Sequence, residues 1–354
     1  MRLKWIVLAT IIFSMLGSNV CLAANADWYL YVWSDASNSG EDFGPFQTTS
    51  SSNVFLLEGL TITETGLKFC VHNSDWSSMY GWSQGNEGVV SGISETIALG
   101  ATTSASGWLA IPAYIYDVTF NTSEPSICFT THTDTGQKRV SILGDSYSTF
   151  YGWMTPSTNI CYYSNETNLW HEGQDLTQVE QTWWHQVISS NGDYVFERNN
   201  SYSGSTMVNT PLEGMDVSTS FINRADNLGN PDVILICGGT NDNWNTAMTM
   251  GDYKYSDWTE DDKKQFCPGF SYLLYHLKTL YPQAEVYFVL NDILDNVSAP
   301  IRSICTHYGV PVIEPHGIDK CTDGHPTIAG MKTIADAVKN QAYSSFCRVF
   351  LSGR

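Results

Sequence analysis

Residues 232–242 read DVILICGGTND and contain the clearest strand signal of the chain. The run from Val233 to Cys237 is apolar throughout, and two glycines follow it at once. A short apolar run that ends in turn residues predicts a strand buried on both faces. Asn241 and Asp242 therefore stand just beyond the carboxyl end of a predicted core strand.

Similar runs recur after residue 138, with helical patterns between them. Further strands are predicted at Val140–Leu143, Tyr194–Glu197, Glu285–Leu290 and Val310–Ile313. The best helix pattern follows a capping box at Thr259 and Asp262. Its apolar stripe, at helical spacing, comprises Phe266, Phe270, Leu273, Leu277 and Leu280. A last helix is expected over residues 327–343. Alternating strands and helices predict a parallel sheet with helices on both faces.

Residues 27–131 follow a different pattern, in which short alternating runs are separated by clusters of Gly, Ser, Asn and Asp. The strand-like runs are 28–32, 53–57, 67–71 and 115–120. This rhythm predicts an all-β sandwich domain over residues 27–131, followed by an α/β domain over residues 138–354.

The first 26 residues have the pattern of an export signal. Arg2 and Lys4 precede the apolar run Trp5–Leu16, and small residues gather near residue 24. We therefore expect a signal peptide over residues 1–26 and a secreted, periplasmic or cell-surface protein. A lipid anchor at Cys21 is the alternative, although Val20 is not the small residue normally found before a lipidated cysteine. No stretch of the mature chain is apolar enough to predict an integral membrane span.

Composition narrows the classes of partner. The formal net charge is -19 and charged residues make up only 15% of the 354 residues, so binding to nucleic acid or anionic lipid is not expected. Eight cysteines follow the signal, which permits disulfides but fixes no pairing. Because no CxxC pair occurs, a zinc site is not expected, and no metal or cofactor is predicted. The sequence does not predict the oligomeric state.

The loops after the predicted strands carry residues that suit ester hydrolysis, because ligands bind at the carboxyl ends of a parallel sheet. Ser146 follows the first strand, at the start of an expected helix, and needs a base to become a nucleophile. His325 supplies that base and later the acid. The Ser146 N–H, the Gly204 N–H and the Asn241 amide would stabilise the oxyanion. His316 is the alternative base.

Four segments resemble the sequence blocks of the SGNH (GDSL) hydrolase family. They are Gly144–Ser148, Asn200–Gly204, Gly239–Asp242 and the histidine of Asp323–Pro326. The resemblance covers about residues 138 to 346 and implies a flavodoxin-like three-layer α/β/α fold, a serine esterase mechanism and the same oxyanion hole. The aromatic-rich run 152–184 resembles that of secreted Bacteroidetes members of the family. The N-terminal domain is similar to the SusE-like sandwich domains of outer-membrane glycan-binding proteins.

One position departs from the family pattern. The family places its aspartate three residues before the histidine, where this chain has Thr322. Asp323, two residues before His325, is expected to be the third catalytic residue. A backbone carbonyl that orients the imidazole is one alternative, and Asp292, at the end of the fourth predicted strand, is another.

Aromatic side chains indicate the class of substrate. The long segment 151–176 carries Trp153, Tyr162, Tyr163 and Trp170. It is predicted to bind substrate, with Trp153 and Trp170 as contacts, and the alternative is a loop that packs on itself and closes the core. A second aromatic set in the sandwich is a candidate glycan platform, with ordinary core packing as the alternative: Trp28, Trp33, Trp76, Trp82 and Trp108. The sequence thus predicts a secreted esterase that removes an acyl group, with acetyl expected, from a carbohydrate or an acylated small molecule. The alternatives are a lipase or thioesterase, and a glycan-binding protein whose hydrolase half is inactive.

Overall fold

The computed structural model describes residues 27–62, 66–81, 89–90, 92–133, 136–165, 174–292 and 294–351. The chain forms two compact units, and the second contains all residues from Cys128 onward. Three sequence predictions fall outside the described residues: the signal peptide over 1–26, Trp82 and Trp170.

Residues 27–131 form two antiparallel sheets, as the alternating pattern predicts, and the end of this region, from Cys128 to Thr131, belongs to the second compact unit. The first sheet has the order β2-β1-β5-β10-β7 with β6 and β9 attached, and the second has the order β3-β4-β11-β12-β8. The strands are β1 (Trp28–Ser34), β2 (Ser39–Phe43), β3 (Gln47–Thr48), β4 (Val54–Thr61), β5 (Leu67–Asn73), β6 (Met79–Gly81), β7 (Val89–Val90), β8 (Thr96–Ala98), β9 (Gly100–Ala101), β10 (Gly107–Leu109), β11 (Ile115–Asn121) and β12 (Ser126–Thr131). Along β11, every second side chain is buried: Tyr116, Val118 and Phe120.

The tryptophans of the candidate glycan platform do not all share one surface. Trp28 packs into the sandwich, where its ring centroid lies 5.2 Å from that of Phe120. Trp76 and Trp108 are 43% and 42% exposed. Trp28 is therefore partly buried against the sandwich core, whereas Trp76 and Trp108 are exposed at the surface.

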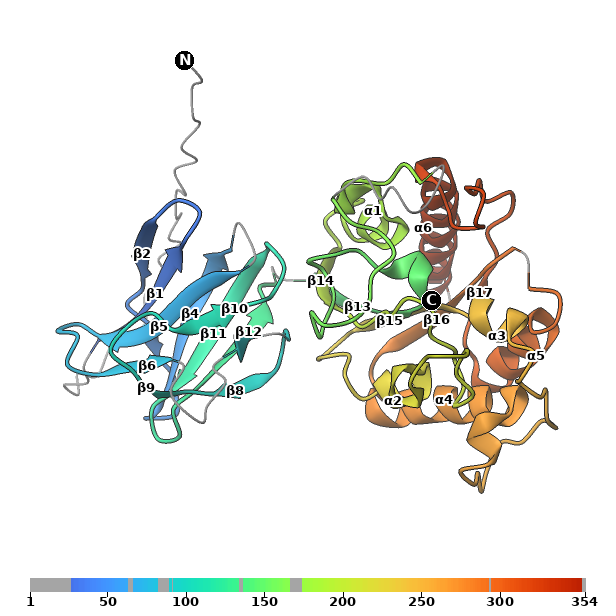
Figure 1. Cartoon of the computed structure of the whole chain (residues 1–354), viewed down its shortest axis with the longest axis horizontal. Coiled ribbons are helices and arrows are strands. Elements are labelled where there is room, and N and C mark those ends of the chain that lie inside the picture. The colour runs from blue at the N-terminus through green and yellow to red at the C-terminus, as the bar shows by residue number, and fades with distance from the viewer. Residues whose placement is uncertain are drawn as a thin grey trace, which may run out of the picture. The chain divides into compact units, whose positions relative to one another are not determined.

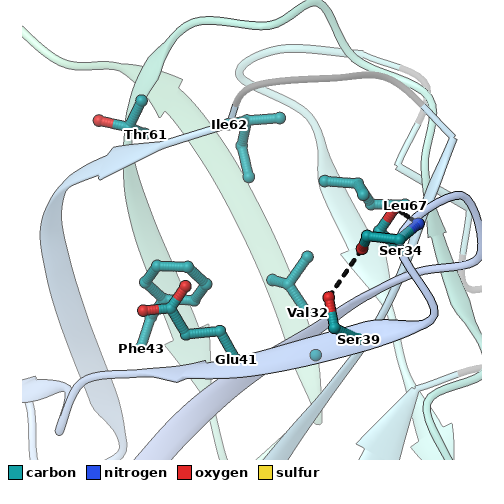
Figure 2. Close-up of a pocket in the computed structure, with 10 residues that line it drawn as sticks. Val32, Ser34, Ser39, Glu41, Phe43, Thr61, Ile62 and Leu67 are labelled. Carbon is teal, nitrogen blue, oxygen red and sulfur yellow. Dashed lines mark hydrogen bonds between the residues drawn. The ribbon is translucent and has the colours of Figure 1, made fainter. Parts of the chain in front are cut away.

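The sandwich also has a hollow of about 230 Å³ beside the β1–β2 hairpin, lined by both polar and apolar residues (Figure 2). Its lining includes Ser39, Glu41 and Phe43 of β2, and Thr61 and Ile62 at the end of β4. The hollow exceeds the room that one water molecule needs. None of the residues predicted to catalyse ester hydrolysis lines it.

The C-terminal unit has a five-stranded parallel sheet of order β14-β13-β15-β16-β17, which confirms the flavodoxin-like prediction. Its strands are β13 (Lys138–Gly144), β14 (Tyr194–Asn199), β15 (Val233–Gly238), β16 (Glu285–Leu290) and β17 (Val312–Ile313). Register pairs such as Ile142 with Leu235 align the carboxyl ends of β13 and β15.

Helices cover both faces of this sheet (Figure 1). The helices are α1 (Trp183–Ile188), α2 (Phe221–Arg224), α3 (Thr240–Trp244), α4 (Phe266–Leu280), α5 (Ser298–Tyr308) and α6 (Ile328–Leu351). Four short 3-10 turns accompany them: η1 (Ser146–Ser148), η2 (Val179–Gln181), η3 (Val217–Thr219) and η4 (Asp262–Lys264).

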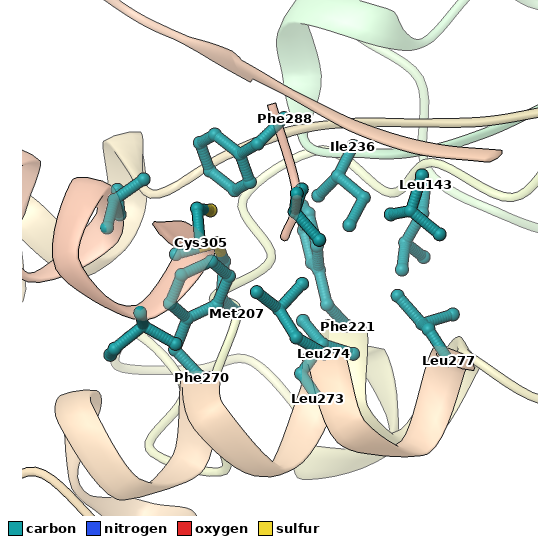
Figure 3. Packing of buried hydrophobic residues seen from close by; sticks show 14 of the residues in the cluster. Leu143, Met207, Phe221, Ile236, Phe270, Leu273, Leu274, Leu277, Phe288 and Cys305 are labelled. Carbon is teal, nitrogen blue, oxygen red and sulfur yellow. The ribbon is translucent and has the colours of Figure 1, made fainter. Parts of the chain in front are cut away.

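The alternation of side chains along β15 shows how the layers pack. Ile234 and Ile236 belong to the buried cluster formed with α2, α4 and α5, part of which Figure 3 shows. Leu235 lies on the opposite face, beside Val187 of α1 and Val338 of α6. A strand that is buried on both faces reads as a continuous apolar run, as residues 233–237 do.

The start of α4 corrects one prediction. The capping-box bonds between Thr259 and Asp262 form, at 2.7 and 3.3 Å, but they precede η4 rather than the long helix. Gln265 is held in an extended conformation by a bridge to Thr249, so α4 begins only at Phe266. Leu280, predicted to lie on the buried stripe of this helix, is 41% exposed. The last helix, α6, extends beyond its predicted end at residue 343.

The cysteines of the described segments are free thiols: Cys70, Cys128, Cys161, Cys237, Cys267, Cys305 and Cys321. Within those segments no group of His, Cys, Asp and Glu side chains could hold a metal ion. The part of the chain that the structure describes also contains no helix with the length and apolar character needed to cross a membrane.

Candidate active site

The candidate site lies where the strand order changes direction, between β13 and β15. Residues at the ends of neighbouring strands are tied together there by backbone hydrogen bonds. The Asp145 N–H donates to the Cys237 carbonyl at 3.2 Å, and the Tyr202 N–H donates to the Gly144 carbonyl at 3.1 Å. Such switch points are where parallel sheets bind ligands.

Ser146 opens η1, a single 3-10 turn, where the sequence had predicted the start of a helix. Asp145 caps this turn, because its carboxylate accepts a hydrogen bond from the Tyr147 N–H at 3.1 Å. Burial raises the pKa of Asp145 to about 6. Ser146 itself is 5% exposed, and its Oγ lies 2.9 Å from His325 Nε2. Two residues that are 179 positions apart in the chain are therefore in hydrogen-bond contact.

The loop that carries His325 folds into a tight turn. Gly324 has a φ of +87°, and the Cys321 N–H donates to the His325 carbonyl at 2.8 Å. Glycine adopts this left-handed conformation without the cost that a side chain would add. The turn brings Asp323 Oδ1 to 3.1 Å from His325 Nδ1 and 3.2 Å from the His325 N–H. A carboxylate two residues before the histidine thus reaches the imidazole.

Three tyrosine hydroxyls bind this loop. Tyr147 donates to the Gly324 carbonyl at 2.5 Å and Tyr163 donates to the Pro326 carbonyl at 2.8 Å. Tyr162 donates to Asp323 Oδ2 at 2.6 Å. The Tyr162 ring also stacks on the His325 imidazole, with centroids 3.6 Å apart and planes 9° apart.

The Asp323 carboxyl is held in its ionised form. Partial burial alone would raise its pKa, but hydrogen bonds from the Cys321 thiol, the Tyr162 hydroxyl and the His325 N–H outweigh burial. The pKa of Asp323 therefore lies well below its usual value. An ionised carboxylate beside Nδ1 favours the imidazole tautomer whose Nε2 is free to accept a proton.

Gly204 and Asn241 are joined through Ser205. The Asn241 amide donates one hydrogen to the Ser205 carbonyl at 2.8 Å, which leaves its second hydrogen for another acceptor. Gly204 has a φ of +83°, a conformation that favours glycine. The structure therefore brings the second and third sequence blocks together.

Arg224 lies beneath the site, and nothing in the sequence singled it out. Its Nη2 donates to the Gly144 carbonyl at 3.1 Å and to Ser205 Oγ at 2.9 Å. Its other nitrogens donate to the carbonyls of Asn200 and Thr219. Burial lowers the pKa of Arg224 to about 9, which leaves the guanidinium charged at neutral pH. The buried Arg224 guanidinium thus connects the first two blocks.

The remaining predicted residues lie in other surroundings. Trp153 packs against the rings of Trp184 and Phe196, so much of its surface serves to close the core. The Asp292 carboxylate accepts hydrogen bonds from the Lys320 ammonium at 2.8 Å and the Ile318 N–H at 3.1 Å. The structure places Asp323, rather than Asp292, against the His325 ring.

The fold and the strand-end loops define a three-layer α/β hydrolase domain. The model of one family, the GDSL-like lipases and acylhydrolases, matches residues 138–342. This match spans more than half of the chain, so the chain belongs to the GDSL-like lipase/acylhydrolase family and is an ester hydrolase.

Two solved structures are similar to this domain. A proposed GDSL-like lipase from Bacteroides ovatus is 45% identical, with a TM-score of 0.55 over 59% of this chain and 99% of its own. A proposed GDSL-like lipase from Bacteroides uniformis is 47% identical, with a TM-score of 0.56 over 59% of this chain and 97% of its own. No protein of curated function shows a significant match to the chain.

Proposed function

We propose that this chain is a secreted serine esterase that removes an acetyl group from a carbohydrate. The observation that carries the catalytic part is the contact of 2.9 Å between Ser146 Oγ and His325 Nε2, with the Asp323 carboxylate on the other ring nitrogen. A serine hydroxyl in contact with a neutral imidazole that a carboxylate orients is the arrangement that nucleophilic acyl transfer needs.

The proposed reaction has two steps. Ser146 Oγ attacks the ester carbonyl carbon while its proton moves to His325 Nε2, and the resulting oxyanion accepts hydrogen bonds from the N–H groups of Ser146 and Gly204 and from the Asn241 amide. The carbon–oxygen bond to the alcohol then breaks, and His325 returns the proton to the leaving oxygen. In the second step His325 deprotonates a water molecule that attacks the acyl-serine, which releases the acid and restores Ser146.

Two observations support the secreted and carbohydrate parts of the proposal. The first 26 residues have the composition of an export signal, and the N-terminal unit carries the exposed rings of Trp76 and Trp108. Aromatic faces at a surface suit the apolar faces of sugar rings. Trp153 and Trp170 stay predictions as substrate contacts.

The catalytic proposal is tested by turnover of p-nitrophenyl acetate. Ser146→Ala should lower kcat by about a millionfold, as loss of a serine nucleophile typically does. Ser148→Ala is the matched control, because Ser148 lies in the same turn and its Oγ accepts a hydrogen bond from Trp183 Nε1 at 3.2 Å. Activity that survives in Ser146→Ala would refute the mechanism.

The substrate proposal needs a separate comparison of kcat/KM. Acetylated oligosaccharides should be hydrolysed faster than long-chain lipid esters and thioesters. Turnover of lipids or thioesters alone would remove the carbohydrate assignment and leave the Ser146 mechanism intact.

A further inference from the structure

We propose that Tyr162 is a positioning residue of this esterase, which locks the Asp323 carboxylate and the His325 ring into the orientation that activates Ser146. The inference rests on the proposed serine mechanism. Tyr162 belongs to the aromatic-rich segment after Ser146 and lies outside the four sequence blocks. It is also far from His325 along the chain, so the sequence alone does not connect the two residues.

The contacts of Asp323 divide between its two oxygens. Oδ1 accepts hydrogen bonds from the His325 N–H and the Cys321 thiol and faces His325 Nδ1 at 3.1 Å. Oδ2 accepts the Tyr162 hydroxyl at 2.6 Å. A hydrogen bond at the second oxygen restricts rotation of the carboxylate about its bond to Cβ. The Tyr162 hydroxyl thus helps to fix the carboxylate plane, and with it the contact of Oδ1 with Nδ1.

The same side chain restrains the imidazole directly. The parallel stack at 3.6 Å covers one face of the His325 ring, and a ring in this position blocks rotation of the imidazole toward that side. Tyr162 is itself fixed, because its N–H donates to Thr149 Oγ1 at 2.8 Å and its ring packs against that of Tyr163. Burial is the largest cause that raises the pKa of Tyr162 well above its usual value, and the hydrogen bond to Asp323 raises it further. The hydroxyl therefore keeps the proton that it donates.

Tyr163 provides a matched comparison. Its hydroxyl also binds the His325 loop, at the Pro326 carbonyl, but its acceptor is a neutral backbone oxygen rather than the carboxylate. Loss of either hydroxyl removes one hydrogen bond from the same loop. A role in loop stability alone therefore predicts equal effects of Tyr162→Phe and Tyr163→Phe.

The test measures kcat and KM for p-nitrophenyl acetate in the full chain. Tyr162→Phe should lower kcat about 10- to 100-fold, since it removes a hydrogen bond to a charged acceptor, with KM changed by no more than about twofold. Tyr163→Phe should lower kcat by less than about threefold. In an Asp323→Ala background, Tyr162→Phe should have almost no further effect, because the group through which it acts is gone.

Two results would overturn the inference and are distinguishable from failure of the mechanism. The first is equal loss of kcat in Tyr162→Phe and Tyr163→Phe. The second is a Tyr162→Phe effect that simply multiplies with that of Asp323→Ala. If Ser146→Ala is inactive, either result refutes the positioning role and leaves the serine mechanism intact. If Ser146→Ala is active, the serine mechanism itself is refuted.

Discussion

Replacement of Arg224 by methionine tests whether a buried cation supports the active-site loops. Arg224 is 7% exposed and serves four acceptors, namely three backbone carbonyls and the Ser205 hydroxyl. Methionine fills a similar volume and offers none of these donors. The carbonyls of Asn200 and Thr219 would then lie next to an apolar side chain, whereas the Gly144 carbonyl would keep its hydrogen bond from the Tyr202 N–H.

The expected loss can be worked from these contacts. Each buried acceptor without a partner costs about 1–3 kcal/mol. The variant also recovers several kcal/mol that the wild type spends on burial of a guanidinium, so the terms partly cancel. We expect Arg224→Met to lower the free energy of unfolding by about 3 kcal/mol and to lower kcat at least about tenfold, because Gly144 lies two residues before Ser146.

Urea denaturation, monitored by tryptophan fluorescence, measures the free energy of unfolding. The unfolding transition in which esterase activity disappears is assigned to the C-terminal unit. Arg302→Met is the control, because Arg302 is half exposed and pairs with Glu314 on the surface at 2.7 Å. An exposed pair contributes no more than about 1 kcal/mol. If Arg224→Met and Arg302→Met destabilise the protein equally, the buried hydrogen bonds of Arg224 contribute nothing, and the reasoning fails.

Two further predictions concern the third sequence block. Asn241→Ala should lower kcat about 100- to 1000-fold with little change in KM. Asn245→Ala is the control, because it removes an amide that donates to the Thr210 carbonyl at 2.8 Å, and it should leave kcat within about threefold of the wild-type value. Equal losses of kcat in the two variants would refute the oxyanion role of Asn241. Burial raises the pKa of Asp242 to about 7, so the folded chain binds this proton more tightly than the unfolded chain. The stability that this proton contributes is full below about pH 4 and is lost as the pH rises to about 7. Asp242→Asn should therefore flatten the decline in unfolding free energy between about pH 4 and 7, and an unchanged slope would contradict the assignment.

The sequence was sufficient to predict the sheet because its strands are buried on both faces. Such strands appear as plain apolar runs, and β13, β15 and β16 lie within a few residues of the predicted positions. The placement of Ser146 and Asn241 beyond the carboxyl ends of the neighbouring strands β13 and β15 followed from the same reasoning, since parallel strands place these ends at one edge. The start of α4 was missed because the bridge between Gln265 and Thr249 is a long-range contact that overrides a local capping signal.

The parts of the site that the sequence missed or left open depend on turns and on contacts between distant residues. Sequence spacing left Asp323 and a backbone carbonyl as alternatives, because the geometry depends on the left-handed conformation of Gly324. Tyr162 comes from a segment without helical or strand periodicity, so its path could not be predicted. Arginine is almost never fully buried unless it is paired, and no local sequence pattern shows that Arg224 has its four acceptors within reach.

Some polar residues in and near the sequence blocks take no part in the proposed chemistry. These residues hold neighbouring loops together. The Asp242 carboxylate accepts the Met207 N–H at 2.8 Å, which connects the third block to the chain after the second. Arg224 connects the second block to the first. Buried polar groups of this kind cost stability when they are incompletely satisfied, but they specify one arrangement of the backbone. Because an apolar packing would leave the orientation of the Gly204 and Ser146 N–H groups undetermined, we infer that the polar network orients these proposed oxyanion donors. Its loss should therefore lower kcat even in variants that remain folded.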